Sequence, residues 1–302
     1  MKTDQTTDTA GVVDVDTQFK ELLRPSGTAW PTVILFFVCL GGLGLVSYFG
    51  VMGQIPLWAC TIINSVFSFL LFSVAHDATH NAISRSKGLN DTLGHIGLVF
   101  FGPFSPLPVA RWIHIQHHRF TNDPELDPDA YAHKSDWLTP LRWMNFDYFY
   151  TRYFLKHGGK QVKRHIVHVV VHFLVVLGAI GFGVWMGYGL ELLMLWLLPT
   201  RINSFLFELM FVYLPHGPFE TKAQDDPFKA TSIRQGWEVL LTPLMAYQNY
   251  HLAHHLYPTA PFYNNIKIWN LKLEEHMSKD PAICGAFNRW PEGAKIGRTA
   301  TI

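Results

Sequence analysis

Four long apolar stretches constrain the fold of this 302-residue chain more strongly than any other feature of its sequence. A helix of about 20 apolar residues crosses the hydrocarbon core of a bilayer. Only 16% of the residues are charged, against about 25% in average soluble domains. The sequence therefore predicts an all-α membrane protein with four transmembrane helices. These are expected at Trp30 to Gly53, Leu57 to Ala75, about Ile166 to Met186, and Leu190 to Leu214.

The connections between these stretches predict how the helices are arranged. Gln54-Ile55-Pro56 joins the first two and Gly187-Tyr188-Gly189 joins the last two, and neither turn contains Lys or Arg. Two helical hairpins are therefore expected. Lys and Arg occur instead before the first hairpin, between the hairpins and after the second one. By the positive-inside rule, these segments and both termini face the cytoplasm.

Arg201 is an exception, because it lies within the fourth stretch. A charge in a membrane helix is costly unless it faces the interior of the bundle or a partner. Glu208, two helical turns further on, is the expected partner.

Residues outside the stretches complete the predicted domain plan. Residues 1–29 are polar and lack the features of a signal peptide, so we expect a flexible cytoplasmic tail followed by a single membrane domain over 30–302. The segment from Leu93 to Ala110 is apolar but interrupted by glycines and prolines, which favours an interfacial or re-entrant position. The segment from Asn264 onward has the mixed composition of an amphipathic helix.

Histidines form three clusters with helical spacing. His76 and His80 follow the second stretch as HxxxH, and HxxHH occurs twice further on. Residues at i, i+3 and i+4 share one face of a helix. Imidazole is a common ligand of iron and zinc, and eight imidazoles exceed what one tetrahedral zinc can use, so two metal ions are indicated. The eight are His76, His80, His114, His117, His118, His251, His254 and His255.

Other metal-binding explanations fit the sequence less well. A zincin-type protease needs Glu directly after the first His, whereas Asp77 follows His76. The acidic run from Thr121 to Asp129 lacks the glycine and terminal glutamate of a calcium loop, so a polar loop is expected there.

In their order and their positions beside two predicted hairpins, the clusters resemble the histidine boxes of the membrane fatty acid desaturase and hydroxylase superfamily. The resemblance implies a cytosolic cap that holds two irons, which activate dioxygen above a membrane lipid. It assigns the ligand role to the eight clustered histidines, and it adds His216, in Leu214-Pro215-His216, as a ninth ligand.

Longer strings narrow the resemblance. Gln116-His117-His118 followed by Thr121-Asn122-Asp123-Pro124, Tyr213 to His216 and Gln248 to Pro258 look most like beta-carotene ring hydroxylases of the cyanobacterial type. This implies hydroxylation of a carotenoid ring. Gly217 stands where those families are expected to have a basic residue, so desaturation of a fatty acyl lipid remains an alternative.

A metal transporter or sensor is the alternative from another class of protein. Transport sites lie near the midplane of the bilayer at broken helices, whereas the histidine clusters lie at the predicted ends of the spans. The positions of the clusters therefore favour the enzyme.

Several further side chains are candidates for supporting roles. Asp77, Asp123, Glu220 and Asn249 lie close in sequence to the clusters and are candidates to orient imidazoles by hydrogen bonds. His168 and His172 lie outside the clusters, within the third predicted span, and are expected to face polar neighbours in the bundle. His95, in the interfacial segment, is a minor candidate for a metal ligand or a group that supports one.

The reaction would need two electrons from outside the chain. The sequence contains no GxGxxG loop after a strand, and Cys39, Cys60 and Cys284 are too far apart for an iron–sulfur motif. We therefore expect a ferredoxin or cytochrome-type donor. A net charge of +1, with Lys and Arg scattered between apolar runs, does not support nucleic-acid binding.

Overall fold

The computed structural model describes residues 14–24, 27–217, 219–288 and 290–291. Helices dominate this part of the chain, and its strands are the short parallel pair β1 (Ile233–Gln235) and β2 (Ile283–Gly285). Four helical segments are long and apolar enough to cross a membrane, as predicted. These are α2 (Trp30–Val51), α3 (Leu57–Thr79), α8 (Lys160–Trp185) and the run Gly189–His216.

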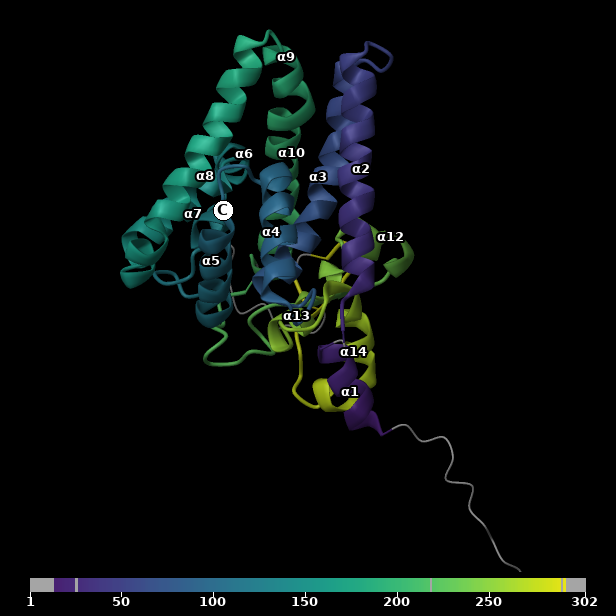
Figure 1. Ribbon diagram of the computed structural model, residues 1–302. Coiled ribbons are helices and arrows are strands. Elements are labelled where there is room, and N and C mark those ends of the chain that lie inside the picture. The colour runs from purple at the N-terminus through teal and green to yellow at the C-terminus, as the bar shows by residue number, and fades with distance from the viewer. Residues whose placement is uncertain (1–13, 25–26, 218, 289, 292–302) are drawn as a thin grey trace, which may run out of the picture.

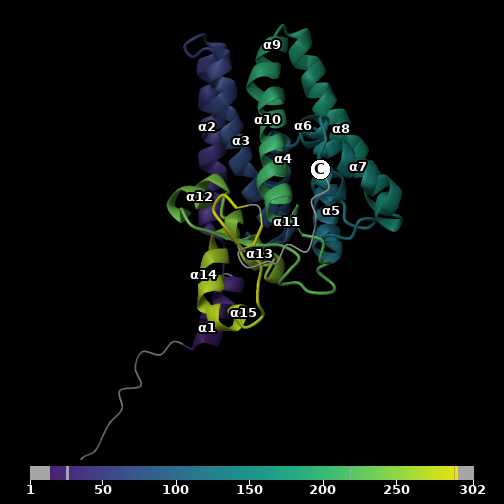
Figure 2. The same ribbon diagram turned by 180° about the vertical axis from the view of Figure 1, so that it is seen from behind.

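The second and third spans differ slightly from their predicted bounds. Helix α3 continues to Thr79, so that His76 lies within its last turn, and α8 begins at Lys160 instead of near Ile166. The predicted interfacial segment contributes to α4 (Lys87–Phe101) and α5 (Leu107–Phe120). Helices α2, α3 and α4 lie side by side in both views (Figures 1 and 2).

Helix α3 is the central helix of the described bundle. Its Leu71 and Val74 are buried with Phe36 of α2, whereas its Phe72 packs on Phe207 of α10 (Leu198–Phe207), with ring centroids 4.6 Å apart. Aromatic rings at this separation gain about 0.5–1.5 kcal/mol beyond the burial of their surface. These contacts on two sides hold the end of α3 in place, which is the end that carries His76 and His80.

The fourth span is helical throughout, but two π-helical turns interrupt it. It consists of α9 (Gly189–Leu192), a π turn at Leu193–Leu197, α10, a second π turn at Glu208–Tyr213, and α11 (Leu214–His216). Each π turn precedes a proline, Pro199 or Pro215, whose missing N–H cannot bond to a carbonyl of the preceding turn. The amide of Asn64 on α3 donates instead to the Leu195 carbonyl at 2.9 Å.

Arg201 does not pair with Glu208, so that prediction was wrong. Its guanidinium donates to both carboxylate oxygens of Asp147, at 2.7 and 3.1 Å, at the start of α7 (Phe146–His157). Glu208 instead accepts a hydrogen bond of 2.5 Å from the hydroxyl of Tyr131. Seven residues of helix separate two side chains by about 10 Å along the axis, so a neighbouring helix supplies the closer partner.

The segments beyond the histidine-bearing end of the spans are short. They include α12 (Glu238–Leu244), α13 (His251–Leu256), α14 (Asn265–Leu271) and α15 (Leu273–Met277). Another short helix, α6 (Thr139–Trp143), precedes α7. The amphipathic C-terminal helix that was expected is divided into α14 and α15, and the indole of Trp269 is fully buried. Residues 292–302 lie outside the described residues.

Part of the segment predicted as a flexible tail is helical. Helix α1 (Val15–Leu23) lies beside α14 in both views (Figures 1 and 2), and its Phe19 ring lies 5.2 Å from the ring of Tyr257. The amide of Asn264 also donates to the Leu22 carbonyl at 3.0 Å. Residues 1–13 and 25–26 of the predicted tail lie outside the described residues.

Candidate metal centre

Four helices that are far apart in the sequence meet where the spans end (Figures 1 and 2). Helix α3 provides His76 and, just after its last turn, His80. Helix α5 contributes an HxxHH motif, α11 ends at His216, and α13 contributes the other HxxHH motif. All nine histidines expected as ligands therefore lie at one end of the bundle.

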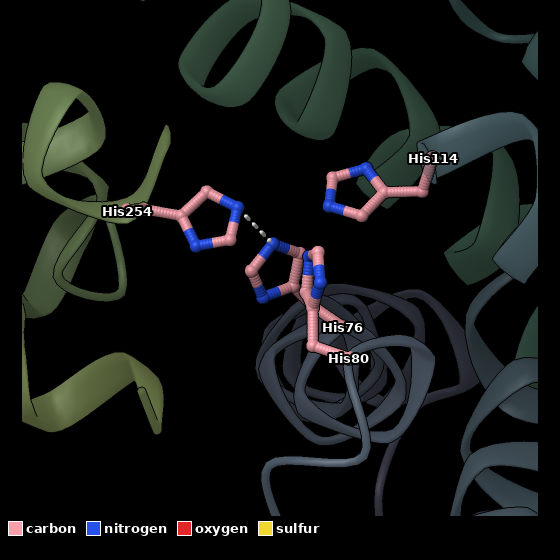
Figure 3. A group of neighbouring side chains, drawn as sticks. All are labelled: His76, His80, His114 and His254. Atoms are coloured by element: carbon pink, nitrogen blue, oxygen red, sulfur yellow. Dashed lines mark hydrogen bonds between the residues drawn. The ribbon is translucent and has the colours of Figure 1, made fainter. Parts of the chain in front are cut away.

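The first group of imidazoles contains His76, His80, His114 and His254, whose ligand nitrogens all lie within 4.8 Å of one another. Figure 3 shows these rings approaching a common region from three different helices. Nε2 of His76 lies 3.0 Å from Nε2 of His254.

The second group contains His117, His216, His251 and His255, and its ligand nitrogens satisfy the same distance limit of 4.8 Å. Nε2 of His251 lies 2.8 Å from Nε2 of His216 and 3.1 Å from Nε2 of His255. His216 is fully buried.

His118 lies between the two groups but extends the first. Its Nε2 is 2.9 Å from Nε2 of His254 and 3.1 Å from Nε2 of His114. Its ring centroid is also 4.2 Å from that of His255 in the second group. The two groups are thus adjacent and together contain nine imidazoles.

Helical geometry explains how each HxxHH motif serves both groups. Each residue advances about 100° around a helix, so the first and last histidines of the motif lie about 40° apart. The middle histidine is rotated from the first in the opposite direction, away from the last. On α5, His114 and His118 join the first group and His117 joins the second. On α13 the assignment is reversed, because His251 and His255 join the second group and His254 the first.

The contacts between imidazoles fit a metal centre better than a hydrogen-bond network. Nε2 of His254 lies within 3.0 Å of two other ring nitrogens, and one N–H cannot satisfy both contacts. Nε2 of His80 is buried and has no hydrogen-bond partner among the residues that the structure describes. Imidazoles about 2.0–2.1 Å from one ion place adjacent nitrogens about 3.0–3.4 Å apart, close to the separations found here.

Burial keeps most of these imidazoles neutral. Desolvation lowers the pKa of His80 to about 3. Desolvation, followed by repulsion from neighbouring imidazoles, also lowers the pKa of His114, His118, His254 and His255 well below the usual value. A neutral imidazole has a free lone pair on one nitrogen, which is the form that binds a metal.

His117 is the exception among the imidazoles outside the spans whose pKa is shifted. Burial alone would lower its pKa, but the carboxylates of Asp129 and Asp127 raise it to about 9. Nδ1 of His117 donates to Asp127 at 2.9 Å and lies 3.2 Å from Asp129. Carboxylates in this position fix the tautomer of a metal ligand and increase its basicity, which leaves Nε2 to face the ion.

Asp127, Asp129 and Gln248 were missed as supporting residues in the sequence analysis. Nδ1 of His251 lies 2.5 Å from the amide oxygen of Gln248. The hydroxyl of Tyr150 on α7 donates to Asp129 at 2.7 Å. The signal for the two aspartates was their place in the acidic loop that directly follows the histidines of α5, which we expected to be only a polar connection.

The supporting residues that were predicted make other contacts. Asp77 accepts from the Thr32 hydroxyl at 2.8 Å and from the backbone N–H of Phe262 at 3.0 Å, so it joins α3 to α2 and to the C-terminal region. Asp123 pairs with Lys222 at 2.8 Å. The amide of Asn249 donates to the hydroxyl of Thr242 at 3.1 Å. An orienting role for Glu220 stays a prediction.

Contacts of α8 with α4 and with the segment just after α4 involve three histidines outside the clusters, His95, His168 and His172. Nε2 of His95 is 2.9 Å from Nε2 of His168, and Nε2 of His172 donates to the Pro103 carbonyl at 2.8 Å. They belong to neither group of converging imidazoles described above.

Comparison with known proteins gives a consistent result over most of the chain. Residues 53–282, which include all nine histidines, match the family described as Fatty acid desaturase. An omega-3 fatty acid desaturase, fat-1, from Caenorhabditis elegans is 38% identical over 112 residues. That match covers 36% of this chain and 25% of the relative, so the chain spans about a quarter of that protein.

Two longer matches are to relatives whose names give different substrates. A beta-carotene ketolase from Paracoccus sp. (strain N81106 / MBIC 01143) is 26% identical over 196 residues, covering 64% of this chain and 71% of the relative. An sn-1 oleoyl-lipid 12-desaturase from Arthrospira platensis is 24% identical over 281 residues, covering 78% of this chain and 73% of the relative.

Proposed function

This chain belongs to the fatty acid desaturase family, and from this we propose that it is an integral-membrane enzyme that oxidises a lipid with dioxygen at a centre of two irons. Its relatives among the ketolases and desaturases are oxidoreductases, which supports the enzyme over a metal transporter or sensor. The convergence of nine imidazoles into two adjacent groups is the observation that carries the proposal.

Each iron would have its own set of ligands. We assign His76, His80, His114, His118 and His254 to one ion, and His117, His216, His251 and His255 to the other. When bound, the two irons supply the binding and activation of dioxygen for removing hydrogen from carbon.

The protein's own groups would prepare these ligands. Burial keeps most of the imidazoles neutral, and Asp127 accepts a hydrogen bond from Nδ1–H of His117. The amide oxygen of Gln248 lies next to Nδ1 of His251, as the carboxylate of Asp127 lies next to Nδ1 of His117. Because imidazoles from four helices already contact one another, the site is preorganised before a substrate binds.

We further propose that α2 with α3, and α8 with the fourth span, form two hairpins whose short turns face away from the cytoplasm. The histidine end would then form a cytoplasmic cap, and residues 30–302 would constitute one membrane domain. The distribution of Lys and Arg supports this orientation. Two electrons would reach the cap from a ferredoxin or cytochrome-type donor.

Hydroxylation of a carotenoid ring is the first candidate reaction. The strings around His216 and from Gln248 to Pro258, together with the match to a beta-carotene ketolase, support it. Desaturation of a fatty acyl lipid is the second candidate, because the match to the oleoyl-lipid 12-desaturase covers a larger share of this chain. Both reactions begin with the removal of hydrogen from carbon.

Expression in a host that makes beta-carotene, with a suitable ferredoxin system, tests the substrate. Chromatography of the pigments and of fatty acid methyl esters from the same cells compares the two candidates directly. More polar pigment with unchanged acyl chains is the expected result. New unsaturated acyl chains with unchanged pigment would establish the second candidate instead.

Metal analysis of the purified protein tests the centre separately from the substrate. Two irons per chain and oxygen consumption that depends on substrate are expected. Zinc or copper at variable stoichiometry, without such oxygen consumption, would overturn the proposed enzyme.

A further inference from the structure

A cluster of cations lies where α7 turns into α8. Arg152 and Lys156 are one helical turn apart on α7, and Lys160, Lys163 and Arg164 lie in the first turns of α8. All five side chains are exposed. Among the described residues, none of them forms an ion pair with an acidic side chain.

A two-glycine corner fixes this arrangement. Gly159 has a φ of +49°, and a Cβ atom on Gly158 would lie 2.5 Å from the Phe154 carbonyl. Other residues would strain this corner. Only these two glycines separate the end of α7 from the start of α8, so Lys156 and Lys160 flank one short turn.

The same surface has an apolar part. An open groove of about 550 Å³ runs along α7 and is lined by Tyr148, Thr151, Arg152, Leu155 and Lys156. Tyr148 and Leu155 are more than half exposed. The groove thus places two cationic side chains beside an exposed aromatic ring and an exposed aliphatic side chain.

We propose that this surface, Tyr148 to Arg164, binds the headgroup of an anionic phospholipid. The phosphate would contact the lysines and arginines, and the glycerol and upper acyl chain would lie against Tyr148 and Leu155. Basic residues at the end of a membrane helix attract anionic lipids through Coulomb attraction, which acts alongside burial of apolar side chains.

The position of the surface favours a lipid over an acidic protein. Lys160, Lys163 and Arg164 begin an apolar span, and Figure 1 shows this end of α8 opposite the turn that leads to α9. The sequence has no acidic residue between Asp147 and Glu191, so the field of the cluster is not compensated along this segment. Glu125 and Asp127 line a small pocket with Arg152 and Lys156, and in the described part of the chain neither carboxylate forms an ion pair with either cation.

Lipid binding can be measured without enzyme activity. The full-length protein in a nonionic detergent is titrated with dioleoyl phosphatidylglycerol or dioleoyl phosphatidylcholine, and the Tm is recorded with each lipid. A ligand that binds the folded state raises the Tm. Phosphatidylglycerol is expected to raise the Tm by at least about 3 °C, and phosphatidylcholine is expected to have no comparable effect.

Two triple variants locate the effect. K156Q/K160Q/K163Q is expected to weaken phosphatidylglycerol binding at least tenfold, since each nearby cation contributes to the attraction. The matched control K20Q/K267Q/K279Q removes three exposed lysines from α1, α14 and the segment after α15, and it should retain the Tm shift. K156R/K160R/K163R keeps the charges and should also retain it.

Three outcomes would overturn the proposal. In the first, both neutralising variants respond equally to phosphatidylglycerol. In the second, inorganic phosphate at the same concentration reproduces the shift, which would make the site an anion site without a lipid. In the third, K156Q/K160Q/K163Q retains the lipid response but no longer binds an acidic ferredoxin.

Two further measurements keep the interpretation independent of folding and of the enzyme. Native mass spectrometry of the wild-type protein from an equimolar lipid mixture should retain phosphatidylglycerol over phosphatidylcholine, and equal retention would contradict the proposal even if a variant fails to fold. The iron content of K156Q/K160Q/K163Q should equal that of the wild type. A loss of lipid preference with normal iron, or the reverse, separates this site from the proposed function.

Discussion

His117 differs from its neighbours because two carboxylates contact one of its nitrogens. Asp127 accepts a hydrogen bond from Nδ1–H of His117 and is itself fixed by the backbone N–H groups of Asn122 and Asp129, at 2.8 and 2.9 Å. Asp129 is held in turn by Tyr150. The ring of His117 is therefore oriented by groups on the loop after α5 and on α7, which a pattern of histidines does not reveal.

Asp127→Asn should weaken the second metal group selectively. The amide keeps the shape of the side chain but removes the charge that orients His117, and such partners typically change metal affinity about 10- to 100-fold. We expect about half of the iron to be lost during dialysis against a chelator, measured by elemental analysis. Asp123→Asn is the control because Asp123 pairs with Lys222 instead. Full iron retention in Asp127→Asn would contradict the role of Asp127.

Replacing a single clustered histidine by alanine tests the ligand assignment. His80→Ala, His118→Ala and His255→Ala should each abolish product formation and lower the iron content, because each removes one of the converging ring nitrogens. His168→Ala should retain both, since the ring of His168 contacts His95 away from the two groups. Equal losses in all four variants would place the metal centre elsewhere.

Among the helices, close contact between α3 and α4 positions His76 and His80. A Cβ atom on Gly94 of α4 would lie 2.7 Å from Cβ of Ala78 and 3.0 Å from Cδ1 of Leu107. Ala78 lies between His76 and His80. The absence of a side chain at Gly94 therefore allows α4 to approach the end of α3 that carries these imidazoles.

Gly94→Ala should disturb this contact. Forcing an extra methyl group into a packed interface costs about 1–3 kcal/mol, so we expect a lower Tm and a faster loss of iron on heating. Gly41→Ala on α2 is the matched control, because a Cβ atom there would meet nothing within 4 Å. A Tm for Gly94→Ala as high as that of the control would show that α4 can shift without affecting the site.

At the scale of the whole molecule, the proposed topology places every histidine group on one side of the membrane. A reporter fused after Ile302 should therefore behave as cytosolic, and a tag inserted near Gln54 should be accessible from outside. Protease protection in sealed vesicles measures both. The opposite location of either probe would break the proposed orientation, because the turn and the histidine end lie at opposite ends of α3 (Figure 1).

Much of the fold could be predicted because its signals are local. A long run without charge indicates a membrane helix whatever surrounds it, and the spans at α2 and α3 were placed to within a few residues. The predicted end of α3 and the predicted start of α8 were less accurate. Polar residues such as His76 and Lys160 belong to these helices, although hydropathy alone would place them outside. The short helix α14 packs against α1, which is far away in the sequence, so local patterns do not reveal its environment.

Local spacing was enough to group eight histidines into three clusters and to place the members of each cluster near one face of a helix, because these properties depend on helical periodicity. His216 was added by the resemblance and not by spacing. Which imidazoles meet depends on the tertiary structure, which separated His117 from His114 and His118. It likewise paired Arg201 with Asp147 instead of Glu208 and brought Asp127 to His117. These contacts join different helices, or a helix to a loop. Their geometry follows from how whole elements pack, and the spacing of residues along one helix carries no information about that packing.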